Sequence, residues 1–134
     1  MRTNRSIPDA TVIPELAYSD VSAAAEWLCD AFGFSVRLRI ANHRVQLTAG
    51  EGAIVLHDGG DGEAARCADR VMVRVDDADA HCAHAERKGA RIVRRPADHP
   101  FGERQYAAED LSGRLWIFTQ TIADVAPEDW GGTR

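Results

Sequence analysis

The sequence lacks the features that mark several classes of protein. It has no apolar run long enough to span a membrane and no N-terminal block typical of a signal peptide. It has no excess of basic residues, and its net charge of −5 argues against nucleic-acid binding. Its 3 cysteines are scattered and odd in number, so we expect no disulfide framework and a cytoplasmic location. It also lacks a phosphate-binding loop, a nucleophile elbow and a Cys–His catalytic signature.

What remains is the composition of an ordinary globular protein. The chain has 134 residues, of which 45% are apolar and 28% charged, enough for one domain with a real core. We expect this domain to span residues 10–122. Residues 1–9 are polar and predict a loosely held N-terminal arm, and residues 123–134 form a polar tail that contains Trp130.

The pattern of predicted elements repeats. In the first half a strand leads to a helix that Asp20 or Ser22 caps and Gly33 ends, and three strands follow. In the second half Asp77 caps a helix that stops at Gly89, again followed by three strands. The distance from cap to glycine is almost equal, which indicates a duplicated unit. The sequence therefore predicts two β-α-β-β-β modules, residues 10–58 and 69–122, joined by a Gly-rich linker at 59–68.

Each predicted sheet has two different apolar faces. One face packs on the helix of its own module, and it comprises Val12, Leu16, Tyr18, Val71, Val73, Val75, Trp116 and Phe118. The other face is too apolar to be left in water, and it comprises Ile13, Val55, Met72, Leu115 and Ile117. Two curved sheets that face one another would bury this second face and leave a lined cleft between them.

Two segments carry a resemblance to a known family. "LAYSDVSAAAEWLCDAFGF" is similar to its strand, Asp and helix that ends in Phe-Gly-Phe, and "FGERQYAAEDLSGRLWIF" is similar to its Asp-x-x-Gly turn and Trp-containing last strand. In this order they resemble the vicinal oxygen chelate superfamily of glyoxalases, bleomycin-resistance proteins and ring-cleaving dioxygenases. The resemblance implies an α+β fold whose two modules form an incomplete barrel with a central cleft, commonly in a homodimer.

Metalloenzymes of that superfamily hold a divalent ion with four side chains from the first and last strands of the modules. The corresponding positions here are Ile13, Val55, Arg70 and Ile117, none of which ligates such a cation. Only Glu15 and His57 lie nearby as donors, and two ligands are too few for a stable site. We therefore expect no metal and no cofactor.

Glu15 and His57 are the candidates for acid–base chemistry, because both are predicted to point into the cleft from neighbouring strands. A carboxylate beside an imidazole orients it and raises its pKa. The alternatives are a polar pair that merely lines a cavity, or a Glu15 bonded to Arg70 or Arg74. We commit to neither residue as catalytic.

Cationic and aromatic side chains complete the predicted ligand site. Arg70 and Arg74 flank Met72 on one face and either hold an anionic ligand group or neutralise acidic residues. In "PFGERQY", Phe101 takes the place of a drug-stacking aromatic in the bleomycin-resistance proteins, although loop packing explains it equally well. Two further positions of that strand, Arg104 and Tyr106, share one face and offer a cation and a hydroxyl.

On the second helix, His81 and His84 lie one turn apart with Cys82 between them. We predict a solvated pair with Cys82 turned inward rather than a zinc site, because no further ligand is near.

The sequence thus predicts a metal-independent protein that binds a small amphipathic or aromatic molecule, of the antibiotic-sequestering or carrier type. The rival prediction is an enzyme of the same superfamily, either a metal-dependent lyase or dioxygenase or a metal-free catalyst that uses Glu15 and His57. The expected partners are a small organic ligand and a second copy of the chain, without nucleic acid or membrane. The predicted ligand-binding residues are Ile13, Glu15, Val55, His57, Arg70, Met72, Arg74, Phe101, Arg104, Tyr106 and Ile117.

Overall fold

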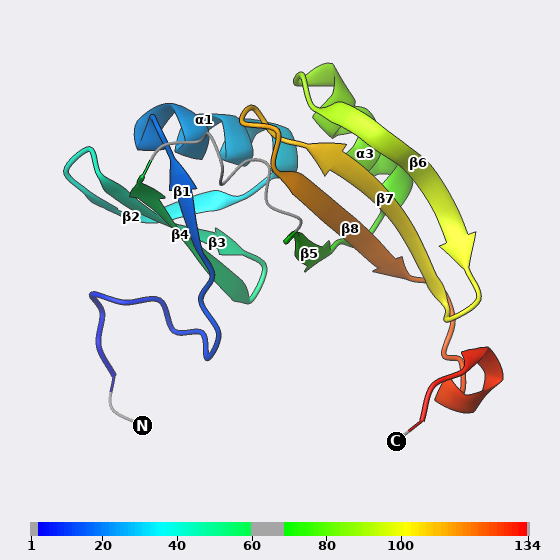
Figure 1. Cartoon of the computed structure of the whole chain (residues 1–134). Helices are drawn as coiled ribbons and strands as arrows, with labels where there is room; N and C mark the ends of the chain where they lie inside the picture. The colour runs from blue at the N-terminus through cyan, green and yellow to red at the C-terminus, as the bar shows by residue number, and fades with distance from the viewer. Residues whose placement is uncertain (1–2, 60–68, 134) are drawn as a thin grey trace. The chain divides into compact units, whose positions relative to one another are not determined.

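The computed structural model describes residues 3–59 and 69–133. The chain divides into two compact units, residues 1–67 and 68–134, which we call module one and module two. Each module contains a four-stranded mixed sheet and one long helix (Figure 1). Except for Gly59, the predicted linker lies outside the described residues.

Module one has the predicted β-α-β-β-β order. Its sheet runs β1-β4-β3-β2, with β1 parallel to β4 and the other neighbours antiparallel. The elements are β1 (Glu15–Tyr18), α1 (Val21–Phe32), β2 (Ser35–Ile40), β3 (Arg44–Ala49) and β4 (Gly52–Asp58).

Module two repeats this connectivity, and the predicted fold class is thereby confirmed. Its sheet runs β5-β8-β7-β6, and β5 is parallel to β8 as β1 is to β4. The elements are β5 (Val71–Arg74), α3 (Ala78–Arg87), β6 (Arg91–His99), β7 (Glu103–Glu109), β8 (Leu115–Thr121) and the short 3₁₀ helix η1 (Pro127–Trp130).

The helix ends follow the predicted signals. Of the two candidate caps for α1, Asp20 is the one used: its carboxylate accepts the Ala23 N–H at 3.0 Å. The helix ends at Gly33, whose φ of 80° is easily reached only by glycine. In module two, Asp77 caps α3 in the same way by accepting the Ala80 N–H at 3.1 Å.

The core of each module lies between its helix and its sheet. Leu16, Tyr18, Trp116 and Phe118 are buried as predicted. The expectation for Val12 was wrong, because β1 begins only at Glu15 and Val12 is 77% exposed. Met72 is 60% exposed on the edge strand β5.

The C-terminal tail packs against the turn between β6 and β7. The Ile122 N–H donates to the Gly102 carbonyl at 2.9 Å. The Phe101 ring stacks on His99 with centroids 5.1 Å apart, and it contacts Trp130 of η1 at 5.2 Å. Phe101 therefore serves at least to anchor the tail, which is the packing role that the sequence left open.

Candidate functional site

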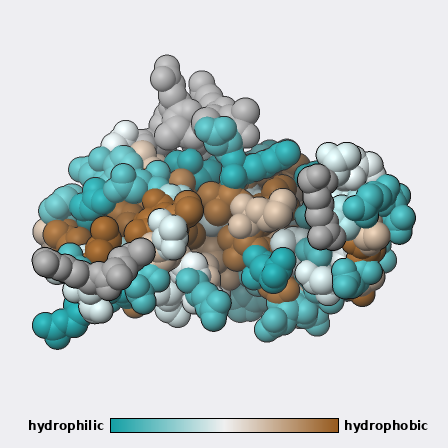
Figure 2. All heavy atoms as spheres, turned by 90° about the horizontal axis from the view of Figure 1, so that it is seen from below, coloured by the Kyte–Doolittle hydropathy of each residue, from teal (hydrophilic) through white to brown (hydrophobic). Residues whose placement is uncertain are grey.

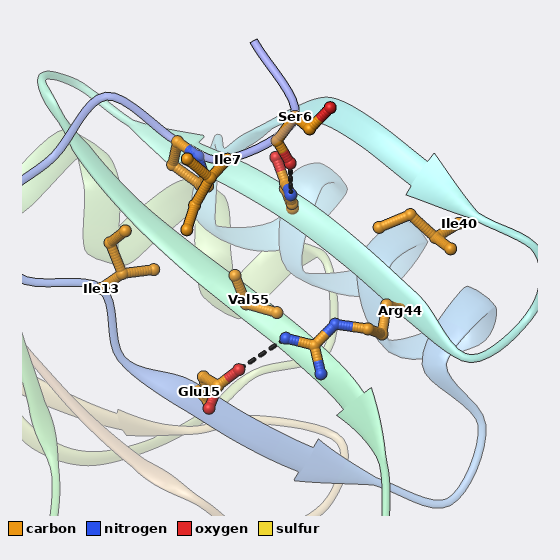
Figure 3. A pocket seen from close by; sticks show the side chains of 9 residues that line it. Ser6, Ile7, Ile13, Glu15, Ile40, Arg44 and Val55 are labelled. Atoms are coloured by element: carbon orange, nitrogen blue, oxygen red, sulfur yellow. Dashed lines mark hydrogen bonds and ion pairs between the residues drawn. The ribbon is translucent and has the colours of Figure 1, made fainter. Parts of the chain in front are cut away.

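A pocket of about 360 Å³ opens on the face of the module-one sheet that is turned away from α1 (Figure 3). Its walls combine apolar side chains with a few polar ones. In the close-up, Ile7, Ile13 and Val55 surround the apolar part, while Glu15 and Arg44 lie together at one side. The lining residues are Ser6, Ile7, Pro8, Ile13, Glu15, Ile40, Arg44, Gln46 and Val55.

Strand register explains why these residues meet. Glu15 of β1 pairs with Val55 of β4, and Val55 pairs with Gln46 of β3. Side chains of directly paired residues lie on the same face of a sheet. Arg44, two positions before Gln46, shares that face as well. Three neighbouring strands thus present a carboxylate, a guanidinium, an amide and an isopropyl group side by side.

The polar side of the pocket is an ion pair. Arg44 Nη2 donates to Glu15 Oε1 at 2.5 Å. This hydrogen bond, with the charge of Arg44, lowers the pKa of Glu15, and the charge of His57 adds to the effect. Both side chains keep contact with water, so the pair stabilises the fold only slightly. Its importance lies in placing charge at the edge of an apolar pocket.

The N-terminal arm covers part of this sheet face. Gln46 Nε2 donates to the Ser6 carbonyl at 3.0 Å, and Arg37 Nη2 donates to the Arg5 carbonyl at 2.9 Å. Arg37 also donates to the Gln46 side-chain oxygen, and Pro8 is buried. Two side chains of the sheet thus bind the main chain of the arm, a contact that the sequence did not predict.

Glu15 and His57 lie on one sheet face, but Glu15 does not bond to His57. The Glu15 carboxylate pairs with Arg44 of its own module instead of the imidazole. His57 Nδ1 lies 3.3 Å from the Asp58 carbonyl oxygen. The arrangement therefore offers an ion pair for binding rather than a preformed acid–base dyad.

In module two, Met72 pairs with Ile117 and Arg74 pairs with Thr119. These four residues share the sheet face turned away from α3, because the neighbouring Phe118 contacts His81 of that helix. Arg70 is exposed just before β5. A hydrogen bond from Thr119 lowers the pKa of Glu103, and the charge of Arg74 contributes. At least Arg74 thus acts on an acidic neighbour, one of the two predicted roles.

Arg104 and Tyr106 do share a face, but it is the one that α3 covers. Arg104 binds Asp79 of α3 at 2.9 Å and Asp98 at 2.9 Å. The Tyr106 hydroxyl lies 2.5 Å from His81 Nδ1, and burial raises the pKa of Tyr106. The predicted cation and hydroxyl are therefore engaged within module two, by Asp79, Asp98 and His81. His81 is likewise half-buried rather than solvated, whereas Cys82 is buried as predicted.

Comparison with known proteins decides the family. The family model described as "Glyoxalase/Bleomycin resistance protein/Dioxygenase superfamily" matches residues 10–118. The chain belongs to this superfamily. No curated protein matched the chain.

Solved structures of the superfamily share the fold. TioX from Micromonospora sp. ML1 is 34% identical, with a TM-score of 0.70 over 87% of this chain and 100% of TioX. TnmS3, an antibiotic binding protein from Streptomyces sp. CB03234, is 22% identical, with a TM-score of 0.67 over 86% of this chain and 98% of that one. A glyoxalase/bleomycin resistance protein from the same Streptomyces strain is 22% identical, with a TM-score of 0.66 over 83% and 100%.

The structure shows where the residues lie that the resemblance assigns to the superfamily's metal positions. Ile13 and Val55 line the module-one pocket, and Ile117 is buried in module two. Among residues 3–59 and 69–133, no three His, Cys, Asp or Glu side chains gather in a geometry that would hold a metal ion. Metal independence stays a prediction, and so does a cleft shared by the two modules.

Several large apolar side chains are exposed to solvent. Figure 2 shows brown apolar areas bordered by hydrophilic residues. The exposed large apolar side chains include Ile7, Val36, Ile40, Met72 and Val93. No helix in the described part of the chain is long and apolar enough to cross a membrane.

Several residues of the pocket were not predicted from the sequence. Arg44 and Gln46 were detectable, since alternation along residues 43–50 puts them on one face. The choice between that face and the helix side needed the register with Val55. The arm residues Ser6, Ile7 and Pro8 gave no signal, because an irregular segment has no periodicity that predicts where it docks.

Proposed function

We propose that this chain is a small-molecule-binding member of the superfamily, of the antibiotic-sequestering or carrier type, and that the module-one pocket takes part in binding. The observation that carries the proposal is an open pocket of about 360 Å³ with apolar walls and one ion pair at its edge. Such a pocket suits an organic molecule with an apolar body and one polar end. The printed description of TnmS3 as an antibiotic binding protein supports the same class of ligand.

Of the predicted ligand-binding residues, Ile13, Glu15 and Val55 line this pocket, and His57 lies further along the same face. We propose that Met72, Arg74 and Ile117 contribute from the equivalent face of module two, with Arg70 at its margin. Arg104 and Tyr106 are left out of the proposed site because their polar groups bond to α3 and to Asp98.

We propose further that the protein acts without a metal or another cofactor, as a cytoplasmic homodimer. The absence of ligating side chains at Ile13, Val55 and Ile117 supports the first point. The scattered cysteines support the cellular location.

The proposal is tested by filling the pocket. Val55→Phe adds a bulky ring to the floor, and we expect it to weaken binding of anilinonaphthalene sulfonate, an amphipathic aromatic dye, by about tenfold. Val36→Phe on β2 is the matched control, since Val36 is exposed and does not line the pocket. Dye affinity that is equal in both variants and in the unaltered chain would contradict the proposal.

The rival enzyme has its own test. A purified protein that retains Zn, Ni, Fe or Mn at one ion per chain would favour the metal-dependent enzyme. Native mass spectrometry of the same sample also identifies any organic compound retained by the chain. For the acid–base alternative, the Glu15→Gln variant removes the carboxylate, so a turnover that depends on Glu15 would replace the binding proposal.

A further inference from the structure

The N-terminal arm forms one wall of the module-one pocket. Three of the nine lining residues, Ser6, Ile7 and Pro8, belong to it. The opposite wall is the sheet with the segment just before β1, from which Val55 and Ile13 face the arm (Figure 3). A molecule in this pocket would therefore lie between arm and sheet rather than on an open surface.

The arm is attached by a short chain of hydrogen bonds. Arg37 binds the Gln46 oxygen, which leaves the Gln46 amide nitrogen to bind the Ser6 carbonyl, and a second Arg37 nitrogen binds the Arg5 carbonyl. With the arm in place Gln46 is only 5% exposed. Lifting the arm would break two hydrogen bonds to main-chain carbonyls but would return all these groups to water. The attachment is thus specific in position and weak enough to open.

The apolar side chains of the arm are only partly buried. Pro8 is buried, but Ile7 remains 52% exposed although it turns toward the pocket (Figure 3). A ligand that covered Ile7 would gain the free energy of removing this surface from water. At the polar side, Arg44 uses a single nitrogen for Glu15, and its other N–H groups donate to no described residue. These groups suit an anionic oxygen of a ligand.

We propose that the N-terminal arm is a strap that closes the pocket over a flat apolar ligand with an acidic group, which Arg44 binds. The inference rests on the proposed binding function. Ile7 and Pro8 supply the closing wall, and Arg37 with Gln46 fixes the strap in its closed position.

The first test weakens the strap in the full-length protein in two independent ways. Ile7→Ser removes apolar wall, and Arg37→Met removes the attachment. We expect each to weaken binding of anilinonaphthalene sulfonate about fivefold to tenfold. The controls are Val12→Ser, which alters an exposed residue outside the pocket, and Arg39→Met, which alters the other arginine of β2. Both controls are expected to bind the dye as the unaltered chain does.

The second test follows the strap directly by proteolysis. Trypsin cuts after Arg5, whose carbonyl is held by Arg37. We expect the Arg37→Met variant to be cut there several times faster than Arg39→Met, and bound dye to slow the cut in the unaltered chain. Mass spectrometry of the released peptide measures the rate.

The outcomes separate the two proposals. Dye affinity that is equal in Ile7→Ser, Arg37→Met and their controls, while Val55→Phe still weakens binding, overturns the strap and leaves the binding function. Cleavage after Arg5 that neither Arg37→Met nor dye changes also overturns the strap. An unaltered chain that takes up no dye counts against the binding function, and against the strap with it.

Discussion

Modules one and two share one connectivity but use the sheet face turned away from the helix differently. In module one this face carries a pocket of about 360 Å³ with an ion pair at its edge. In module two the corresponding face carries a chain of hydrogen bonds, from Gln105 to Thr119 at 3.1 Å and from Thr119 to Glu103 at 2.6 Å. Elsewhere in module two, a hollow of about 70 Å³ beside β6 and β7 is far too small for a drug-sized ligand.

The two ends of the chain also pack on their modules in different places. The N-terminal arm lies across the face of the module-one sheet turned away from α1, whereas the C-terminal tail packs at the β6–β7 turn through Phe101 and Gly102. A duplicated unit therefore acquires different roles from the segments added to it and from the pairing of its polar side chains. Arg44 keeps donors available, while Arg104 is bound by two carboxylates.

The largest expected effect comes from a substitution that acts on the C-terminal tail and not on the N-terminal arm. Gly102 has a φ of +85°, and a Cβ there would collide with the Ala123 carbonyl of the tail. We expect Gly102→Ala to lower the free energy of unfolding by about 2–4 kcal/mol, through backbone strain and displacement of the tail. Chemical denaturation measures the loss.

Gly113→Ala is the matched control for this change. Its φ of +83° imposes the same strain, but a Cβ there meets open space. We expect it to cost only about 1 kcal/mol. Equal losses of unfolding free energy in the two variants would show that the tail contact contributes nothing. Dye binding is expected to persist in both variants, because neither residue lines the module-one pocket.

A smaller effect distinguishes Tyr106, which stabilises the fold, from Arg44, which we propose binds the ligand. Tyr106→Phe removes the hydroxyl that bonds to His81, and we expect a loss of about 1 kcal/mol in unfolding free energy with unchanged dye affinity. Arg44→Met is expected to do the reverse, weakening the dye about fivefold with little change in stability, since its ion pair is open to water. Calorimetric titration and thermal unfolding measure both quantities. A Tyr106→Phe variant that loses dye affinity would return Tyr106 to the ligand site.

The smallest effect concerns the pH dependence of the ion pair. The pKa of Glu15 lies below its ordinary value of 4.5 because Arg44 bonds to its carboxylate. A depressed pKa adds stability above that ordinary value, and this stability is lost as the pH falls through the lowered pKa. We expect an NMR titration of the Glu15 carboxyl to show a midpoint below 4.5 that rises in Arg44→Met. A midpoint that is the same in both proteins would argue against the pair in solution.

Local signals predicted most of the fold. Asp20 and Asp77 cap the helices, glycines follow them, and alternation identifies the strands, because each of these effects acts within a few residues of the chain. The equal spacing of caps and glycines then indicated the duplication.

The site was harder to predict because it depends on contacts between distant segments. Alternation correctly put Arg104 and Tyr106 on one face, but only the packing of α3 on the sheet reveals that this is the helix side. Arg44 as the partner of Glu15 depends on the order β1-β4-β3, which brings strands together that are separate in sequence. Ile7 and Pro8 belong to an irregular segment whose docking is decided by side chains on β2 and β3.

Arg37 and Gln46 hold the arm by its backbone oxygens and not by its side chains. Substitutions at Arg5 or Ser6 that retain a normal peptide geometry therefore keep these hydrogen bonds. Ile7 can likewise be replaced without breaking them. Natural or designed substitutions in the arm can therefore reshape one wall of the pocket for a different ligand while the sheet beneath it stays the same.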